Sequence, residues 1–212
     1  ARSCRPAGSA ERMQRSYAVS SCEGAPDWET IPAAQIDEAQ WLPNPGVAAW
    51  AQVCAAADAL FVRLFAREAE PLARFTGETD MICLDSCLEF FFCPLPDDTR
   101  YFNFEFNPNG ALYLGFGHDR YDSVRQLVPR AGSFFCVEQL KQGDVWEIGF
   151  CIPFSFIRLY APEFTLRPGL RLRGNFYHCG EETCAPRYLS WNRIHCETPE
   201  FHQPSDFGWL VF

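Results

Sequence analysis

The sequence predicts an all-β domain: a two-sheet antiparallel β-sandwich of the immunoglobulin-like or jelly-roll type, with one or two short helices. Three observations lead to this fold class. Aromatic residues make up 16% of the chain, with 20 Phe and only 2 Met. Apolar and polar residues alternate along several short segments, and Pro, Gly and Asp separate these segments. Aromatic side chains pack well on a pleated sheet, and short strands without intervening amphipathic helices are typical of sandwiches.

The clearest strand is residues 101–107, in which phenylalanine alternates with polar side chains, so that one face is apolar and the other polar. A Pro-Asn-Gly turn then leads into residues 111–116, which predicts a β-hairpin. A short helix is expected near residues 45–57 and a single helical turn at residues 154–160. The same alternation predicts further strands at residues 59–67, 88–92, 146–152 and 170–177.

The chain of 212 residues is long enough for one large domain. Residues 1–16 are polar and charged without periodicity, which predicts a disordered leader with Met13 as a candidate initiator. Residues 17–212 form the expected sandwich domain. The odd count of 11 Cys and the absence of an apolar N-terminal signal favour a cytoplasmic protein, or an extracellular one if a signal sequence has been removed.

The formal net charge of −9 argues against a nucleic-acid partner and against an anionic membrane surface, because both are bound mainly through clustered Lys and Arg. No run approaches the roughly 20 apolar residues of a membrane span. Metal binding is not predicted either. Structural zinc sites usually contain a close Cys-x-x-Cys pair, and the cysteine spacings here are Cys83-x3-Cys87-x5-Cys93 and Cys179-x4-Cys184-x11-Cys196.

Strand parity places a set of polar side chains on sheet faces that are expected to meet water: Arg63, Asn103, Glu105, Glu147, Arg173, Asn175 and Tyr177. Planar polar groups beside aromatic rings suit the hydroxyls and the C–H face of a sugar. The alternative is that any antiparallel sheet has one wet face. Residues 186–192 add Tyr188 and Trp191 as candidates for stacking on a pyranose, with core packing as their alternative.

Catalytic signatures such as a phosphate loop, a nucleophile elbow or a zinc-protease helix are absent from the sequence. No catalytic residue is therefore predicted. A glycoside-processing enzyme remains an alternative, with Glu105 and either Glu89 or Glu147 as paired carboxylates. A sandwich that binds proteins without affinity for sugars is the third possibility.

Several motifs occur in an order that resembles the family 9-like carbohydrate-binding proteins, stand-alone bacterial relatives of the family 9 modules of xylanases. These motifs are residues 85–92, 101–110, 146–148, 175–180 and 188–192. The resemblance implies a β-sandwich in which two Trp side chains enclose a sugar, polar side chains hold its hydroxyls and calcium ions are structural. Trp191 matches one such aromatic, whereas residues 81–84 lack the second, and the calcium sites cannot be assigned to particular residues.

The resulting hypothesis is a non-catalytic module that binds a mono- or oligosaccharide of the xylan or glucan type, with no cofactor other than the calcium that the resemblance implies. The predicted ligand contacts are Trp191, Tyr188, Asn103, Glu105, Asn107, Arg173, Asn175, Tyr177 and Arg187.

Overall fold

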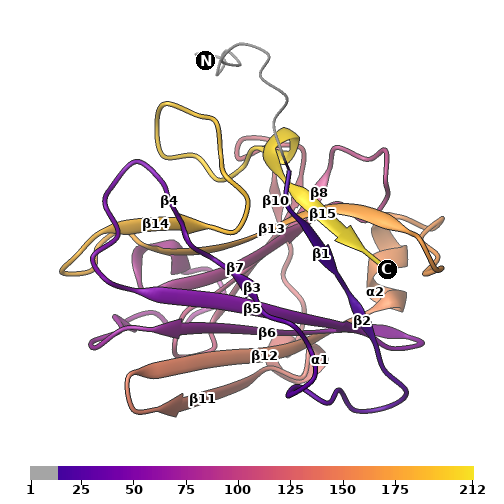
Figure 1. The fold of residues 1–212 in the computed structure, drawn as a ribbon, viewed down its shortest axis with the longest axis horizontal. Coiled ribbons are helices and arrows are strands. Elements are labelled where there is room, and N and C mark those ends of the chain that lie inside the picture. Colours follow the sequence, from indigo (N-terminus) through magenta and orange to yellow (C-terminus); the bar gives the residue numbers. More distant parts are fainter. Residues whose placement is uncertain (1–13) are drawn as a thin grey trace.

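The computed structural model describes residues 14–212 (Figure 1). Residues 1–13, most of the expected leader with its candidate initiator Met13, lie outside the described residues. Ser16, the last residue of that leader, already belongs to strand β1 (Ser16–Ala18), which pairs with the strand nearest the C-terminus. None of the helices in the described range is long and apolar enough to cross a membrane.

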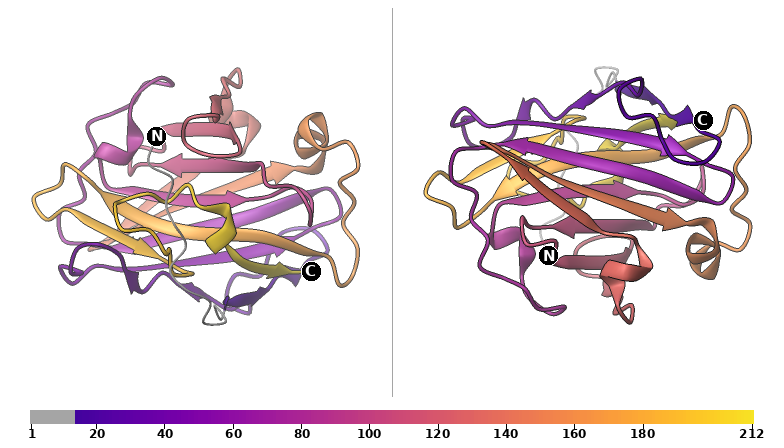
Figure 2. Two further views of the ribbon diagram at one scale, coloured as in Figure 1. Left: turned by 90° about the horizontal axis from the view of Figure 1, so that it is seen from above. Right: turned by 90° about the horizontal axis from the view of Figure 1, so that it is seen from below.

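Two β-sheets form the fold, and each view in Figure 2 has a different sheet in front. The large sheet contains, in spatial order, β1, β15 (Gly208–Val211), β13 (Arg171–Gly180), β7 (Cys87–Phe92), β8 (Tyr101–Phe106), β9 (Leu112–Gly117) and β10 (Val124–Arg125), with β14 (Arg187–Ser190) and β4 (Glu38–Ala39) beside β13. The small sheet contains β11 (Glu138–Gln142), β12 (Val145–Pro153), β6 (Ala59–Arg67), β5 (Ala48–Ala55) and β2 (Ser20–Ser21), with β3 (Ala34–Gln35) beside β5.

Most strand pairs are antiparallel, as predicted, and the exceptions among the described residues are the parallel pairs β1–β15 and β2–β5. The helices are short: α1 (Ala131–Phe134), α2 (Phe154–Tyr160) and the 3-10 turns η1 (Ile82–Leu84) and η2 (Pro204–Asp206). The predicted helical turn at residues 154–160 and the hairpin β8–β9 are confirmed. The helix expected near residues 45–57 is wrong. That segment is strand β5, in which Ala49, Ala51 and Val53 alternate into the core.

The main core lies between the sheets, and the apolar face of β8 supplies much of it. The rings of Phe104 and Phe106 lie against Phe150 of the small sheet, with centroids 5.6 Å and 4.7 Å apart. The side chains of Phe102, Phe104 and Phe106 are fully buried. The period-2 alternation therefore identifies the inner face of β8 correctly.

The outer face of the large sheet is also buried, and this departs from the predicted exposed polar face. Every residue of β7 and β8 is buried, because side chains from the connections cover this face in a second apolar cluster that includes Ile82, Ile194 and Phe201. Arg63 and Glu147 are not part of it. They belong to the small sheet, where they form an ion pair of 3.5 Å.

Candidate functional site

A pocket opens on the outer face of the large sheet, where the covering segments leave a cavity of about 480 Å³. The register of β7, β8 and β9 determines which side chains form the floor of this pocket. Glu89 of β7 lies directly opposite Glu105 of β8, which lies opposite Tyr113 of β9, so the three side chains share one face. Around this floor stand Cys179 of β13 and Tyr188 of β14. The other lining residues come from the turns and long connections: Met81, Ile82, Cys83, Leu84, Arg120, Ser123, Glu181, Pro199, Glu200, Phe201 and His202.

Aromatic rings form one wall of the pocket. Tyr188 of β14 meets Phe201 edge to face, with centroids 5.9 Å apart, and Trp41 packs against the same tyrosine at 5.5 Å. Phe201 in turn stacks on Tyr177 at 4.2 Å. Because these rings support one another, the half-buried Tyr188 is held with part of its surface towards the cavity. A ring held in this way offers the apolar plate on which a ligand can stack.

Carboxyl groups dominate the electrostatics of the pocket. Burial raises the pKa of Glu89 well above its ordinary range, and the neighbouring charge of Glu105 raises it further. Burial likewise raises the pKa of Glu105 to about 7. The cation on the rim is Arg120, which lies 3.7 Å from Glu200. Near neutral pH the floor therefore holds carboxyl groups that are partly protonated and can both donate and accept hydrogen bonds.

The raised pKa of Glu105 predicts a pH-dependent stability. Between the ordinary pKa of 4.5 and the folded value of about 7, the folded chain keeps a proton that the unfolded chain has lost. The contribution of Glu105 is therefore complete below pH 4.5 and is lost as the pH rises through 7. Burial lowers the pKa of His178 to about 4 and of His202 to about 3. The contribution of these two histidines to stability is therefore lost as the pH falls below 6.5.

Comparing the wild type with the Glu105→Gln variant separates the contribution of Glu105 from the opposing contribution of the two histidines. Between about pH 5 and about pH 8, the wild type is expected to lose roughly 3 kcal/mol of stability relative to this variant, while both share the histidine contribution. Urea unfolding of the two proteins at matched pH values measures the difference. A constant difference across this range would show that Glu105 has an ordinary pKa in the folded state.

Two buried oxygen atoms at the edge of the floor lack hydrogen-bond partners among the described residues: Oδ1 of Asn103 and Oγ of Ser123. Both crowd Gly115, where a Cβ atom would lie 2.3 Å from the first and 2.6 Å from the second. Glycine is thus required for these groups to come together. Ser123 lines the cavity, but its hydroxyl oxygen is buried and lies against Gly115.

Of the predicted contacts, Glu105 and Tyr188 line the pocket. Asn103 lies beside it and donates a hydrogen bond of 2.7 Å to Glu105, so it orients that carboxyl rather than facing the cavity. Arg173 lies over the ring of Trp209, far along β13 from the pocket floor, and is not among the lining residues.

The structure contradicts the prediction that Trp191 stacks on a sugar. Its indole is only 4% exposed and belongs to the main core, where it meets Phe176 edge to face at 5.6 Å. Tyr177 is also fully buried and faces the back of Phe201. Parity places Tyr177 on the outer face, but the covering loops put Phe201 between its ring and the cavity.

The remaining predicted contacts are buried structural residues. Asn107 donates hydrogen bonds to the carbonyl of Phe75 at 2.8 Å and to Asp85 at 3.0 Å. Asn175 donates to the carbonyl of Asn192 at 2.9 Å. Arg187 points away from the pocket and forms a buried ion pair with Glu68. Each of these side chains satisfies buried polar groups, which is the usual role of polar residues inside a protein.

Several pocket residues were not predicted as ligand contacts. Glu89 and Tyr113 lie within segments that were predicted as strands, so alternation assigns each of them to one strand face, but only the register of β7, β8 and β9 brings them beside Glu105. Arg120, Glu181 and Phe201 lie in irregular connections or at the end of a strand. No periodicity reports on the direction of such side chains, so the sequence alone contains no signal for them.

Comparison with known proteins identifies the fold and the family of the chain. The model of the family described as "Carbohydrate-binding family 9" matches residues 22–212. The structure of a putative carbohydrate-binding protein from Bacteroides uniformis is similar, with 25% identity, a TM-score of 0.77 and coverage of 94% of this chain and 100% of that chain. No curated protein matches the chain.

A family 9 carbohydrate-binding module from Caldicellulosiruptor kristjanssonii has the same fold. Its complex with glucose has 12% identity, a TM-score of 0.64 and coverage of 93% of this chain and 95% of that chain. Its complex with cellotriose has 13% identity, the same TM-score of 0.64 and coverage of 93% of both chains. The predicted sandwich and the predicted family resemblance are confirmed. The chain therefore belongs to carbohydrate-binding family 9 and is a carbohydrate-binding module.

Proposed function

We propose that the pocket on the outer face of the large sheet binds one sugar unit or the end of a short oligosaccharide of the glucan type. The observation that carries the proposal is the meeting of a half-exposed aromatic ring, Tyr188, with the paired carboxyl groups of Glu89 and Glu105 in one cavity of about 480 Å³. Small-ligand sites have volumes of about 300–1,000 Å³ and combine apolar walls with a few polar groups.

Each part of the pocket suits a different part of a sugar. The ring of Tyr188 offers an apolar plate for the C–H face of a pyranose, with Tyr113 on the opposite side of the floor as a second aromatic side chain. Glu89 and Glu105 can exchange hydrogen bonds with hydroxyl groups, and the guanidinium of Arg120 can donate to them. The bound glucose and cellotriose of the Caldicellulosiruptor kristjanssonii module support a glucan-type ligand.

Isothermal calorimetry with glucose, cellotriose and xylotriose tests the proposal. The wild type is expected to bind at least one of these sugars, and Tyr188→Ala is expected to weaken binding about tenfold, since ring stacking and the associated burial contribute about 1.4 kcal/mol. Tyr121→Ala is the matched control, because this tyrosine is 89% exposed and does not line the pocket. Its affinity should equal that of the wild type.

Two results would contradict the proposal. One is equal loss of affinity in Tyr188→Ala and Tyr121→Ala, and the other is no binding of any of these sugars by the folded wild type. Turnover of cellotriose is monitored in the same samples by the release of reducing ends. Turnover that Glu105→Gln abolishes would instead identify the Glu89 and Glu105 pair as catalytic.

A further inference from the structure

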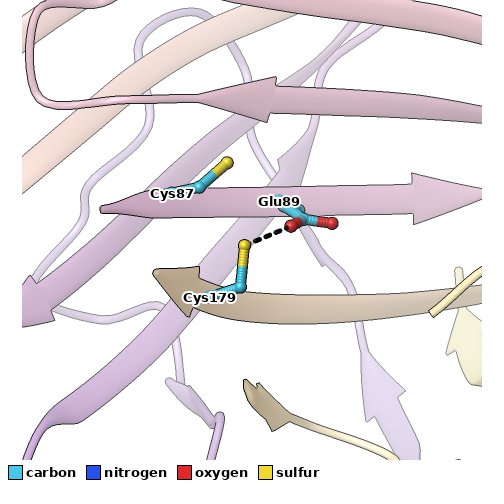
Figure 3. A group of neighbouring side chains, drawn as sticks. All are labelled: Cys87, Glu89 and Cys179. Carbon is cyan, nitrogen blue, oxygen red and sulfur yellow. Dashed lines mark hydrogen bonds between the residues drawn. The ribbon is translucent and has the colours of Figure 1, made fainter. Parts of the chain in front are cut away.

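Two thiols and a carboxyl group lie close together on β7 and β13 (Figure 3), and two of the three residues, Glu89 and Cys179, line the pocket. Cys87 of β7 and Cys179 of β13 are register partners on neighbouring strands, and Glu89 follows Cys87 by two residues on the same face. One ligand atom from each residue lies within 4.8 Å of the others. The thiol of Cys179 also donates a hydrogen bond of 3.1 Å to the Glu89 carboxylate.

This cluster is deeply buried, with Cys87, Cys179 and Glu89 exposed by 0%, 1% and 3%. From the described part of the chain, the carboxyl group of Glu89 receives a hydrogen bond only from Cys179, and it forms no ion pair there. The charged neighbours of Glu89 are mostly acidic: Glu105 and Glu181, with Arg120 as the opposing cation. A buried carboxyl group without a cation in contact can ionise only at a high cost, and a bound metal ion would stabilise its ionised form.

The residue types indicate which class of ion fits. Thiolates are soft ligands that select zinc-class or cuprous ions, whereas calcium and magnesium require several oxygen ligands. Zinc is typically four-coordinate, and non-structural sites use three protein ligands and leave one position open. Glu89 and Cys179 line the cavity, so an ion bound here has a route of entry and a coordination position that faces the pocket.

We propose that Cys87, Cys179 and Glu89 form a binding site for a thiophilic divalent metal ion of the zinc class, open on its fourth side towards the pocket. Binding requires the deprotonated form of each ligand, so each ion that enters displaces the protons of Cys87 and Cys179 and also the proton of Glu89 where that carboxyl group is protonated. Sequence spacing does not reveal this site, because the two cysteines lie on separate strands and become neighbours only through the register of β7 and β13. The inference goes beyond sugar binding and is tested without any sugar.

The probes are Zn²⁺ and Co²⁺ added to the full chain, which is first reduced with a phosphine and dialysed against a chelator. Calorimetry is expected to give one zinc ion per chain, with a proton release that appears as a dependence on buffer ionisation enthalpy. Cobalt is expected to give a thiolate charge-transfer band in the near ultraviolet. Cys87→Ser and Cys179→Ser should each remove this band. Glu89→Gln removes a charged ligand and should weaken cobalt binding by at least the roughly 10- to 100-fold that loss of an outer-shell partner costs.

Cys136→Ser is the matched control. Cys136 and Cys151 are another pair of neighbouring thiols, located on the opposite side of the sandwich, and the substitution should leave the cobalt spectrum unchanged. Circular dichroism and melting temperature establish that each variant is folded, and Glu89→Gln, which preserves side-chain volume, provides a second test if a cysteine variant unfolds.

Three outcomes would overturn the inference: no cobalt band from the folded, reduced wild type; a band that survives both Cys87→Ser and Cys179→Ser; or thiol counting that finds Cys87 and Cys179 joined in a disulfide that resists the reductant.

Discussion

Replacing Trp191 with alanine is expected to lower the free energy of unfolding by about 3–5 kcal/mol, the usual cost of truncating a buried tryptophan. The indole is buried against Phe176 and fills the space above Gly208, where an added Cβ would lie 2.5 Å from the indole ring. Gly208 has no side chain that could fill the space that the indole leaves. The folded fraction of this variant should bind sugar as the wild type does, because the indole does not line the pocket.

Equilibrium unfolding in urea measures this loss, and Trp209→Ala provides the matched control. Trp209 is only half-buried and lies under the guanidinium groups of Arg171 and Arg173, at 4.5 Å and 5.1 Å. Its truncation should therefore cost clearly less than that of Trp191. Unchanged stability together with lost sugar affinity in Trp191→Ala would mean that the indole contacts the ligand after all.

The contrast between Trp191 and Glu105 shows what the sequence could predict. Period-2 alternation reports which face of a strand a side chain occupies, and on this basis Phe104 and Glu105 were assigned to opposite faces, as found. Alternation does not report what covers each face. The predicted polar surface is covered by connections that carry Ile82, Ile194 and Phe201, so polar side chains such as Asn107 serve buried backbone groups instead.

Sheet order was the other missing information. Arg63 and Glu147 have the same alternation as Asn103, yet they belong to the small sheet and cannot contribute to the pocket. Glu89 is the opposite case, because it lines the pocket although the sequence indicates it only as a candidate catalytic partner and not as a ligand contact. Its place opposite Glu105 follows from the register of β7 and β8, and register depends on long-range pairing that a single sequence does not determine.

Arg187 was predicted as a sugar contact, and the structure instead places it in a buried polar network. Its guanidinium pairs with Glu68 and donates to the hydroxyl of Ser86 at 3.2 Å. Glu68 also accepts from the indole of Trp146 at 2.7 Å. Burial lowers the pKa of His178 to about 4, so this ring is neutral and accepts a hydrogen bond of 3.1 Å from Arg187. The network ties β14 to the end of β6.

Glu68→Gln is therefore expected to destabilise the protein by about 3–5 kcal/mol, because it leaves the buried guanidinium of Arg187 without its counter-ion. The double variant Glu68→Leu/Arg187→Met should recover much of this loss, since an apolar pair avoids the desolvation of both charges. Urea unfolding of the single and double variants provides the measurement.

The matched control is Glu147→Gln, which breaks the ion pair with Arg63 on the outer surface of the small sheet. A pair that remains in contact with water contributes about 0–1 kcal/mol, so this change should have little effect. Equal losses in Glu68→Gln and Glu147→Gln would mean that water reaches the Arg187 guanidinium. A double variant as unstable as the single one would instead mean that the hydrogen bonds to Ser86 and Trp146, rather than the paired charges, hold β14 in place.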